Sequence, residues 1–125
     1  MFVLYYFNPL YYAHNLYITE IDIPDTVTGI KPHAFRGWNG TSITIPNSVI
    51  SIGDYAFCNC NGLTNITIPD SVTSIGNYAF YGCSSLTSIT FLGTKEQWNA
   101  ISKGGNWNYD TGKYIIHCTD GVISK

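Results

Sequence analysis

The chain repeats itself with a period of 23 residues, and this internal repeat constrains its fold more than any other feature. Residues 43–65 read ITIPNSVISIGDYAFCNCNGLTN, and residues 66–88 read ITIPDSVTSIGNYAFYGCSSLTS, with no gap between them. Residues 21–42 form a 22-residue copy that has lost one residue after Phe35, and a fourth copy begins at residues 89–91 and then departs from the pattern. Chance does not keep so many positions in register, so the sequence predicts one structural unit used several times.

Each copy combines a short strand pattern with residues that end a strand. In residues 66–68 apolar and polar side chains alternate, which is typical of a strand with one buried face. Pro69 lacks a backbone donor and therefore ends that strand. Gly76 permits a tight corner, and residues 78–80 are expected to form one helical or 3₁₀ turn that places Phe80 in the core.

Stacking of these units should bring equivalent side chains into continuous buried rows. A single unit cannot bury its own apolar face, whereas stacked neighbours can. The predicted rows are Ile23, Ile45, Ile68 and Phe91; Phe35, Phe57 and Phe80; and Ala34, Ala56 and Ala79. The strands should then lie about 4.8 Å apart in a short parallel sheet on one side of a β-rich solenoid.

The pattern L-T-x-I-x-I-P-x-S-V-x-x-I-G-x-x-A-F-x-x-C resembles the BspA-like leucine-rich repeats of bacterial surface proteins. The resemblance covers about residues 18–94, and the first copy departs from it. Lys31 stands in place of glycine there, Trp38 replaces cysteine, and the leucine before the next strand is missing. The resemblance implies an α/β-type, right-handed leucine-rich-repeat solenoid with short helical turns. It also implies a surface-exposed or secreted protein that binds host or matrix proteins, or sugars, with no catalytic residue and no cofactor.

The chain divides into three predicted parts. Residues 1–17 form an N-terminal segment over the open end of the first coil, residues 18–92 form about three coils of 22–23 residues, and residues 93–125 form a capping coil. Residues 21–23 are expected as the first strand. In the cap, Thr94 and Gln97 predict a capping box that starts a helix. We expect this helix to bury Trp98 and to replace the usual convex face of the last coil.

The low charge of the chain excludes some classes of partner. Charged residues make up 11% of the sequence, the net charge is −2, and the six basic residues are scattered. Nucleic acid is therefore not an expected partner. No apolar run has the length of a membrane-spanning helix. The apolar N-terminus is short and no basic residue precedes it, so it makes a poor signal peptide. The sequence leaves the oligomeric state open.

The cysteines and histidines do not predict a metal site or a catalytic site. Cys60 and Cys83 hold the same repeat position, and we expect small buried side chains there in preference to a disulfide. The redox state of all four cysteines, which are Cys58, Cys60, Cys83 and Cys118, stays open at this stage. Cys58 and Cys60 lack a second ligand pair at zinc-site spacing. The three histidines are far apart in the repeat, without a nucleophile and an orienting carboxylate.

The outward positions of the predicted strands form the candidate binding face. They are Glu20, Asp22, Ser42, Thr44, Asn65, Thr67, Ser88, Thr90 and His117. A regular array of hydroxyls with two acids at one end suits a protein partner or a glycan. The alternative interpretation is that these Thr and Ser side chains serve only strand propensity and solubility. Trp107 is the best candidate for stacking on a sugar, unless its loop folds inward as a plug. Three interpretations remain: a protein-binding adhesion module, a carbohydrate-binding module, and a structural spacer within a longer surface protein.

Overall fold

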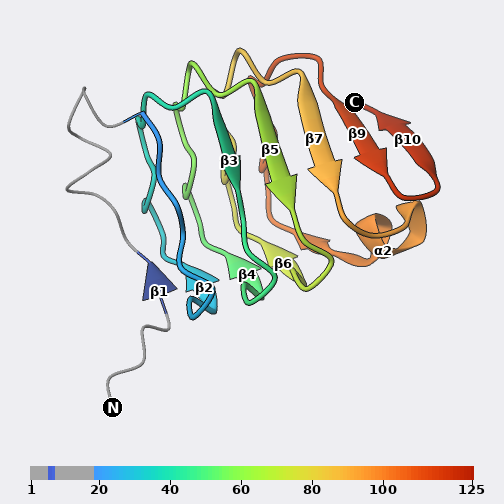
Figure 1. Cartoon of the computed structure of the whole chain (residues 1–125). Coiled ribbons are helices and arrows are strands. Elements are labelled where there is room, and N and C mark those ends of the chain that lie inside the picture. The colour runs from blue at the N-terminus through green and yellow to red at the C-terminus, as the bar shows by residue number, and fades with distance from the viewer. Residues whose placement is uncertain (1–5, 8–18) are drawn as a thin grey trace.

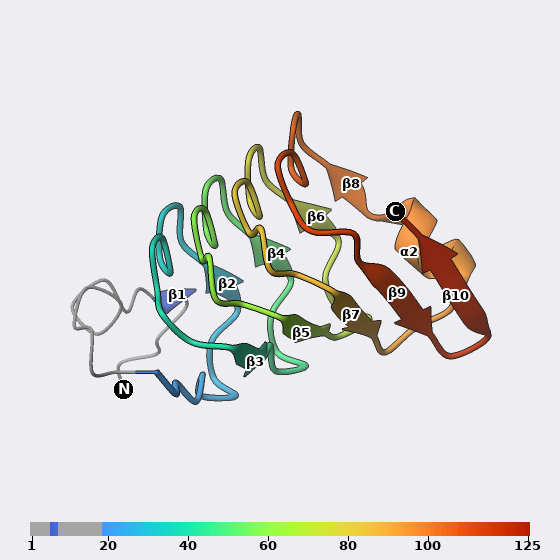
Figure 2. The same cartoon turned by 90° about the horizontal axis from the view of Figure 1, so that it is seen from above.

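The computed structural model describes residues 6–7 and 19–125, which form a solenoid with two sheets on opposite sides of one core (Figure 2). The first sheet has the order β1 (Tyr6–Phe7), β2 (Gly29–Ile30), β4 (Ser51–Ile52), β6 (Ser74–Ile75), β8 (Ser102–Lys103). The second sheet has the order β10 (Gly121–Ser124), β9 (Ile115–Cys118), β7 (Ser88–Phe91), β5 (Asn65–Ile68), β3 (Ser42–Thr44). Helix α2 (Lys95–Ala100) connects β7 to β8.

The predicted parallel sheet is confirmed. In the second sheet, β3 pairs with β5, β5 with β7 and β7 with β9, all in parallel and in the register of the repeat. Only β10 runs antiparallel, beside β9 (Figure 1). The repeat pattern predicts a sheet on one side only, so the first sheet is an addition that the structure reveals. Its two-residue strands pair in the register of the repeat, which places the buried Ile52 between Ile30 and Ile75.

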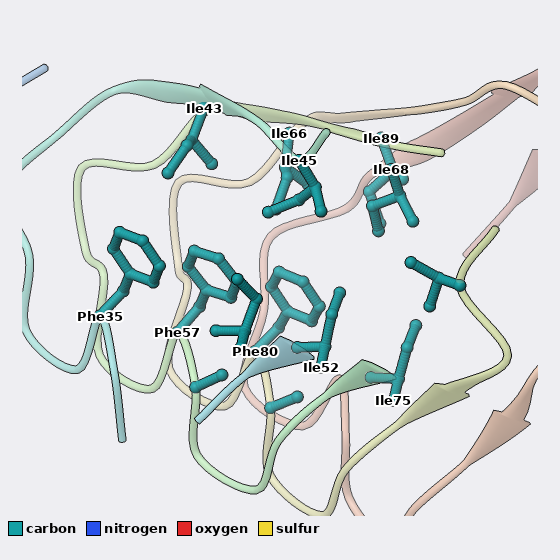
Figure 3. Close-up of a cluster of buried hydrophobic side chains, with 14 of the residues drawn as sticks. Phe35, Ile43, Ile45, Ile52, Phe57, Ile66, Ile68, Ile75, Phe80 and Ile89 are labelled. Carbon is teal, nitrogen blue, oxygen red and sulfur yellow. The ribbon is translucent and has the colours of Figure 1, made fainter. Parts of the chain in front are cut away.

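The predicted rows of buried side chains are also confirmed (Figure 3). The rings of Phe35 and Phe57 stack with centroids 4.8 Å apart, and those of Phe57 and Phe80 with centroids 5.2 Å apart. Ile68 pairs with Phe91 in the strand register, so Phe91 continues the isoleucine row as expected. Aromatic pairs of this kind add about 0.5–1.5 kcal/mol each beyond the area they bury.

The helical turn predicted for residues 78–80 is wrong. The chain forms hydrogen-bonded turns there, and Tyr78 has a φ of 56°, which a right-handed helix cannot accommodate. The backbone bonds explain the difference. The Phe57 N–H donates to the Ala79 carbonyl of the next coil at 2.7 Å, whereas the Ala56 N–H donates within its own coil, to the Gly53 carbonyl. Alternate amides thus join neighbouring coils, and a helix would have used them internally.

The corner at Gly76 requires a glycine because two coils approach closely. A Cβ at Gly76 would lie 2.5 Å from the Asp54 backbone nitrogen and 2.7 Å from the Gly53 carbonyl carbon. Beside this contact, the Asp54 side chain accepts a hydrogen bond from the Asn77 N–H at 2.7 Å. The Asn77 side chain accepts one in turn from the Gly105 N–H, also at 2.7 Å. The corner is therefore fixed by backbone contact and by side-chain acceptors that link successive coils.

The tryptophan of the first coil replaces the leucine that this coil lacks. Counted back from β3, Gly40 stands where the next coil has Leu63. A Cβ at Gly40 would meet the Trp38 ring at 2.0 Å, and Trp38 is completely buried. The ring therefore fills the volume of the missing leucine side chain, and the loss of one residue leaves no void there.

The strand predicted at residues 21–23 is absent. Within the described part of the chain, no backbone ladder joins this segment to β3, so β3 is the first strand of the second sheet. On the opposite side the same two coils remain joined. There β2 pairs with β4, and the Ile50 N–H donates to the Thr28 carbonyl at 2.9 Å. The first coil thus separates from the second on one side only.

The C-terminal coil begins with the predicted capping box. The Gln97 N–H donates to the Thr94 hydroxyl at 3.1 Å, and the Thr94 N–H donates to the Gln97 side chain at 2.8 Å. Trp98 is buried, as expected, and Ile101 is buried beside the end of the helix. However, α2 does not replace the convex turns. It occupies the corner between the two sheets, at the end of the molecule (Figure 2), because a Thr94 cap stands where the earlier coils have a proline-led turn.

The convex turns continue into this fourth coil at residues 104–112, where Asn106 and Asp110 repeat the positive φ angles of the earlier turns. Trp107 takes the position of Ala79, since its carbonyl accepts the hydrogen bond from the Phe80 N–H. Its ring lies edge-on to Phe80, with centroids 6.1 Å apart, and so covers the end of the phenylalanine row. The N-terminal cap predicted for residues 1–17 falls largely outside the described residues; of it, β1 pairs with β2 in parallel.

Candidate functional site

The four parallel strands of the second sheet lie side by side (Figure 1), and their register sets two outward rows of side chains. One row is Ser42, Asn65, Ser88 and Ile115, and the other is Thr44, Thr67, Thr90 and His117. We call this surface the strand face. The backbone ladder fixes both rows, while the intervening Ile43, Ile66, Ile89 and Ile116 are buried and anchor each strand to the core. The structure therefore brings together seven of the side chains proposed from the sequence.

The C-terminal end of the strand face is more apolar than the sequence analysis assumed. Ile115 continues the Ser42 row and is 40% exposed, and Val122 on β10 lies opposite His117 and is 55% exposed. The outward position of Ile115 could have been predicted from the sequence, because Ile115 precedes the buried Ile116 by one residue on the last strand. The position of Val122 depends on the antiparallel return of β10, which no repeat in the sequence predicts.

The N-terminal end of the strand face is acidic and hollowed. Glu20 and Asp22 are exposed there, but they do not lie on a strand of the sheet. A depression of about 210 Å³ separates residues 19–22 from residues 41–44. Its walls carry the two carboxylates together with the hydroxyls of Thr19, Thr41, Ser42 and Thr44. Hydroxyls both donate and accept hydrogen bonds, and ionised carboxylates only accept them, so this end suits a partner rich in donors.

The cysteines that stack between the coils belong to the core. The Cys60 thiol donates to the Phe35 carbonyl at 3.0 Å, the Cys83 thiol donates to the Phe57 carbonyl at 3.1 Å, and both side chains are buried and unpaired in disulfides. Contact with the Cys83 thiol, and then burial, raise the pKa of the Cys60 thiol. Burial also raises the pKa of Cys58. A thiol whose pKa is raised stays protonated at neutral pH and is a poor nucleophile. The expectation of small buried side chains is confirmed.

Trp107 is not the exposed ring expected for sugar stacking. It is half-buried and lies among Phe80, Trp98 and Tyr114, with ring centroids 5.9 Å from Trp98 and 6.2 Å from Tyr114. The inward plug, which the sequence left as the alternative, describes its position. The exposed aromatic side chain of this loop is Tyr109, at 62%.

The histidines occupy separate surroundings. His117 points outward on β9, as expected, and the His33 ring stacks on Tyr55 with centroids 4.9 Å apart. His14 lies outside the described residues. Across residues 19–125, no three histidine, cysteine, aspartate or glutamate side chains are grouped so that they would hold a metal ion. In the same residues, no helix has the length and apolar composition needed to cross a bilayer.

Two solved structures of bacterial leucine-rich repeat proteins align with this chain. A solved structure of a leucine rich cell surface protein from Faecalibacterium prausnitzii A2-165 matches 70% of this chain with 38% sequence identity and a TM-score of 0.68. The match spans 23% of that longer protein. A leucine-rich repeat protein from Bacteroides ovatus ATCC 8483 aligns over 90% of this chain and 47% of its own, with 20% identity and a TM-score of 0.34. No curated protein matches the chain.

Residues 8–104 match the BspA type leucine rich repeat region, in six copies. This match extends over most of the chain and includes every coil that carries the stacked phenylalanines. The chain therefore belongs to the BspA type leucine-rich repeat family.

Proposed function

We propose that the chain is a non-catalytic recognition module of a cell-surface or secreted protein, and that it binds a host or matrix protein through the strand face. The observation that carries this proposal is the regular alignment of the outward side chains on neighbouring strands of the strand face. Seven side chains that can form hydrogen bonds stand in two rows on strands that backbone ladders join to one another. A preorganised surface of this kind binds without the entropic cost of ordering its own backbone.

The family and its solved relative support a position at the cell surface. The relative from Faecalibacterium prausnitzii is described as a cell surface protein, and part of it aligns with the coils of this chain at 38% identity and a TM-score of 0.68. The low charge of the chain, 11% of residues, agrees with recognition through hydroxyl and amide groups in place of strong electrostatic attraction.

A protein partner suits the strand face better than a sugar does. Sugar sites commonly offer an exposed aromatic ring, and the outward rows of β3, β5, β7 and β9 contain none apart from His117. The observation that favours a sugar is Tyr109, which lies 62% exposed on the convex turns, with one side stacked on Tyr81. A carbohydrate site would therefore lie on the turns and not on the strand face.

Binding to a panel of immobilised host-surface and matrix proteins tests the proposal. The variant Thr44→Lys/Thr67→Lys places two long charged side chains on the strand face, and we expect it to bind the identified protein at least about tenfold more weakly. The control Asn47→Lys/Asn61→Lys adds the same charge at exposed positions away from that face, and its affinity should not change. Circular dichroism checks that both variants keep the fold.

Two results would contradict the proposal. One is unchanged affinity of the strand-face variant, and the other is the absence of saturable binding to any protein of the panel, which would favour a structural spacer. A glycan array run in parallel addresses the sugar alternative. Glycan binding that is lost in Tyr109→Ala but kept in the strand-face variant would identify a carbohydrate module.

A further inference from the structure

Among the residues that the structure describes, no strand pairs with the edge of β3 that faces the first coil. Three other junctions of the second sheet are closed by backbone ladders, but residues 19–23 make no ladder with β3 in the described part of the chain. The separation extends to the corner that follows. The Ser71 hydroxyl donates to the Val49 carbonyl of the preceding coil at 2.7 Å, whereas the equivalent Ser48 hydroxyl is buried and has no hydrogen-bond partner.

The open edge of β3 presents a definite set of backbone groups. The Thr41 carbonyl accepts from the Thr64 N–H at 2.8 Å, and the Ile45 N–H donates to the Thr67 carbonyl at 2.9 Å, so residues 41 and 45 direct these groups toward β5. Backbone groups in a strand alternate between its two edges. The N–H and C=O groups of Ser42 and Thr44 therefore point toward the gap. A free strand edge of this kind is a template for pairing with another chain.

The gap itself is a polar cleft with acidic groups on one wall. It has a volume of about 210 Å³ between residues 19–22 and residues 41–44. Glu20 and Asp22 are exposed on the first-coil wall, and none of the described residues that line the cleft is basic. The outward side chains of β3, on the second wall, are hydroxyls. Charge complementarity therefore favours an occupant that carries positive charge and also offers backbone donors and acceptors.

We propose that this cleft binds an extended basic segment of a protein partner, which adds as a strand to the free edge of β3. Backbone bonds to Ser42 and Thr44 would hold the segment, as in other cases of strand addition. Its outward lysine or arginine side chains would lie beside Glu20 and Asp22. The inference rests on the proposed function in one respect, namely that the partner is a protein. The cleft lies at the end of the strand face, and peptide binding to it can be measured without an identified ligand.

Three synthetic heptapeptides with blocked ends test the proposal against the intact 125-residue chain. The first alternates lysine with threonine, the second replaces every lysine by glutamate, and the third is the lysine peptide with its alternate backbone nitrogens methylated. Fluorescence anisotropy of labelled peptides measures affinity. We expect the lysine peptide to bind, the glutamate peptide not to bind, and the methylated peptide to bind at least about tenfold more weakly, because it has lost backbone donors.

A charge-matched pair of variants locates the binding. Glu20→Gln/Asp22→Asn removes the acidic wall, and we expect about fivefold weaker binding of the lysine peptide, since exposed ion pairs contribute modestly. The control Asp25→Asn/Glu96→Gln removes the same charge at exposed positions outside the cleft and should not change the affinity. In NMR hydrogen exchange, the lysine peptide should slow the Ser42 and Thr44 amides.

Equal binding of the lysine and glutamate peptides would overturn the proposal, as would equal affinity of the two variants or unchanged exchange at Ser42 and Thr44. Ser42 and Thr44 belong to both the strand face and the cleft, but these peptide results need no identified protein partner. If the peptide fails to bind while Thr44→Lys/Thr67→Lys still abolishes capture of a matrix protein, this inference fails and the proposed function stands. If the peptide binds at β3 but the strand-face variant has no effect on protein capture, the cleft stands and the strand face does not.

Discussion

Replacement of Phe57 by alanine should destabilise the chain more than any other truncation in the phenylalanine row. Phe57 is completely buried, and its ring stacks on Phe35 at 4.8 Å and on Phe80 at 5.2 Å. Truncation of a buried phenylalanine to alanine costs about 3–5 kcal/mol, and contacts on both ring faces place this site in the upper half of that range. We therefore expect a loss of about 4 kcal/mol, against a total stability of about 5–15 kcal/mol for a domain.

Urea unfolding followed by tryptophan fluorescence measures this loss, because Trp38 reports the first coil and Trp98 and Trp107 report the last. With a slope of about 1.5 kcal/mol per molar urea, a loss of 4 kcal/mol lowers the midpoint by about 2.7 M. Ile50→Ala is the control, since Ile50 is 52% exposed and should change stability by less than about 0.5 kcal/mol. A Phe57→Ala midpoint within 0.5 M or so of the control would refute the continuous stack of rings.

Three further predictions concern the corner, the last coil and the buried thiols. Gly76→Ala should lower the free energy of unfolding in urea by about 2 kcal/mol or more, because its Cβ would lie 2.5 Å from the Asp54 nitrogen. The control Gly62→Ala, whose Cβ would meet nothing closer than 3.8 Å, should lower it by under about 1 kcal/mol. Equal losses in the two variants would contradict the close contact at Gly76. Trp107→Ala should lose about 2 kcal/mol of stability because the half-buried Trp107 ring covers Phe80, while Tyr109→Ala should lose under about 1 kcal/mol. A larger drop in melting temperature for Tyr109→Ala than for Trp107→Ala would mean that Trp107 is not a plug. Because the pKa of Cys60 is raised in the folded state, its contribution to stability is present below the unfolded thiol pKa of about 8.5 and is lost above it, at about 1.4 kcal/mol per pH unit. Unfolding free energies between pH 7.5 and 10 should therefore fall more steeply for the wild type than for Cys60→Ala, and parallel slopes would contradict this.

The sequence determined the features that depend on translation along the solenoid. A 23-residue repeat stacks like on like, so Phe35, Phe57 and Phe80 had to form one row and the outward residues of the strands had to form two others. The capping box at Thr94 and Gln97 was equally readable, because it depends on residues three positions apart. These features need only local spacing and the burial of apolar side chains.

Only the tertiary structure decided how the turns are bonded, how the terminal coils pack and where two coils separate. The convex turns are not helical because their alternate amides bond to the next coil, which a single copy of the sequence does not reveal. Trp107 covers Phe80 because the fourth coil has Asn108 where the earlier coils have a phenylalanine, and Trp38 fills the space of a leucine that its own coil lacks. The first coil separates from β3 on one side while β2 and β4 stay paired on the other. Where a coil departs from the repeat, packing against its neighbours, and not the repeat, sets the conformation.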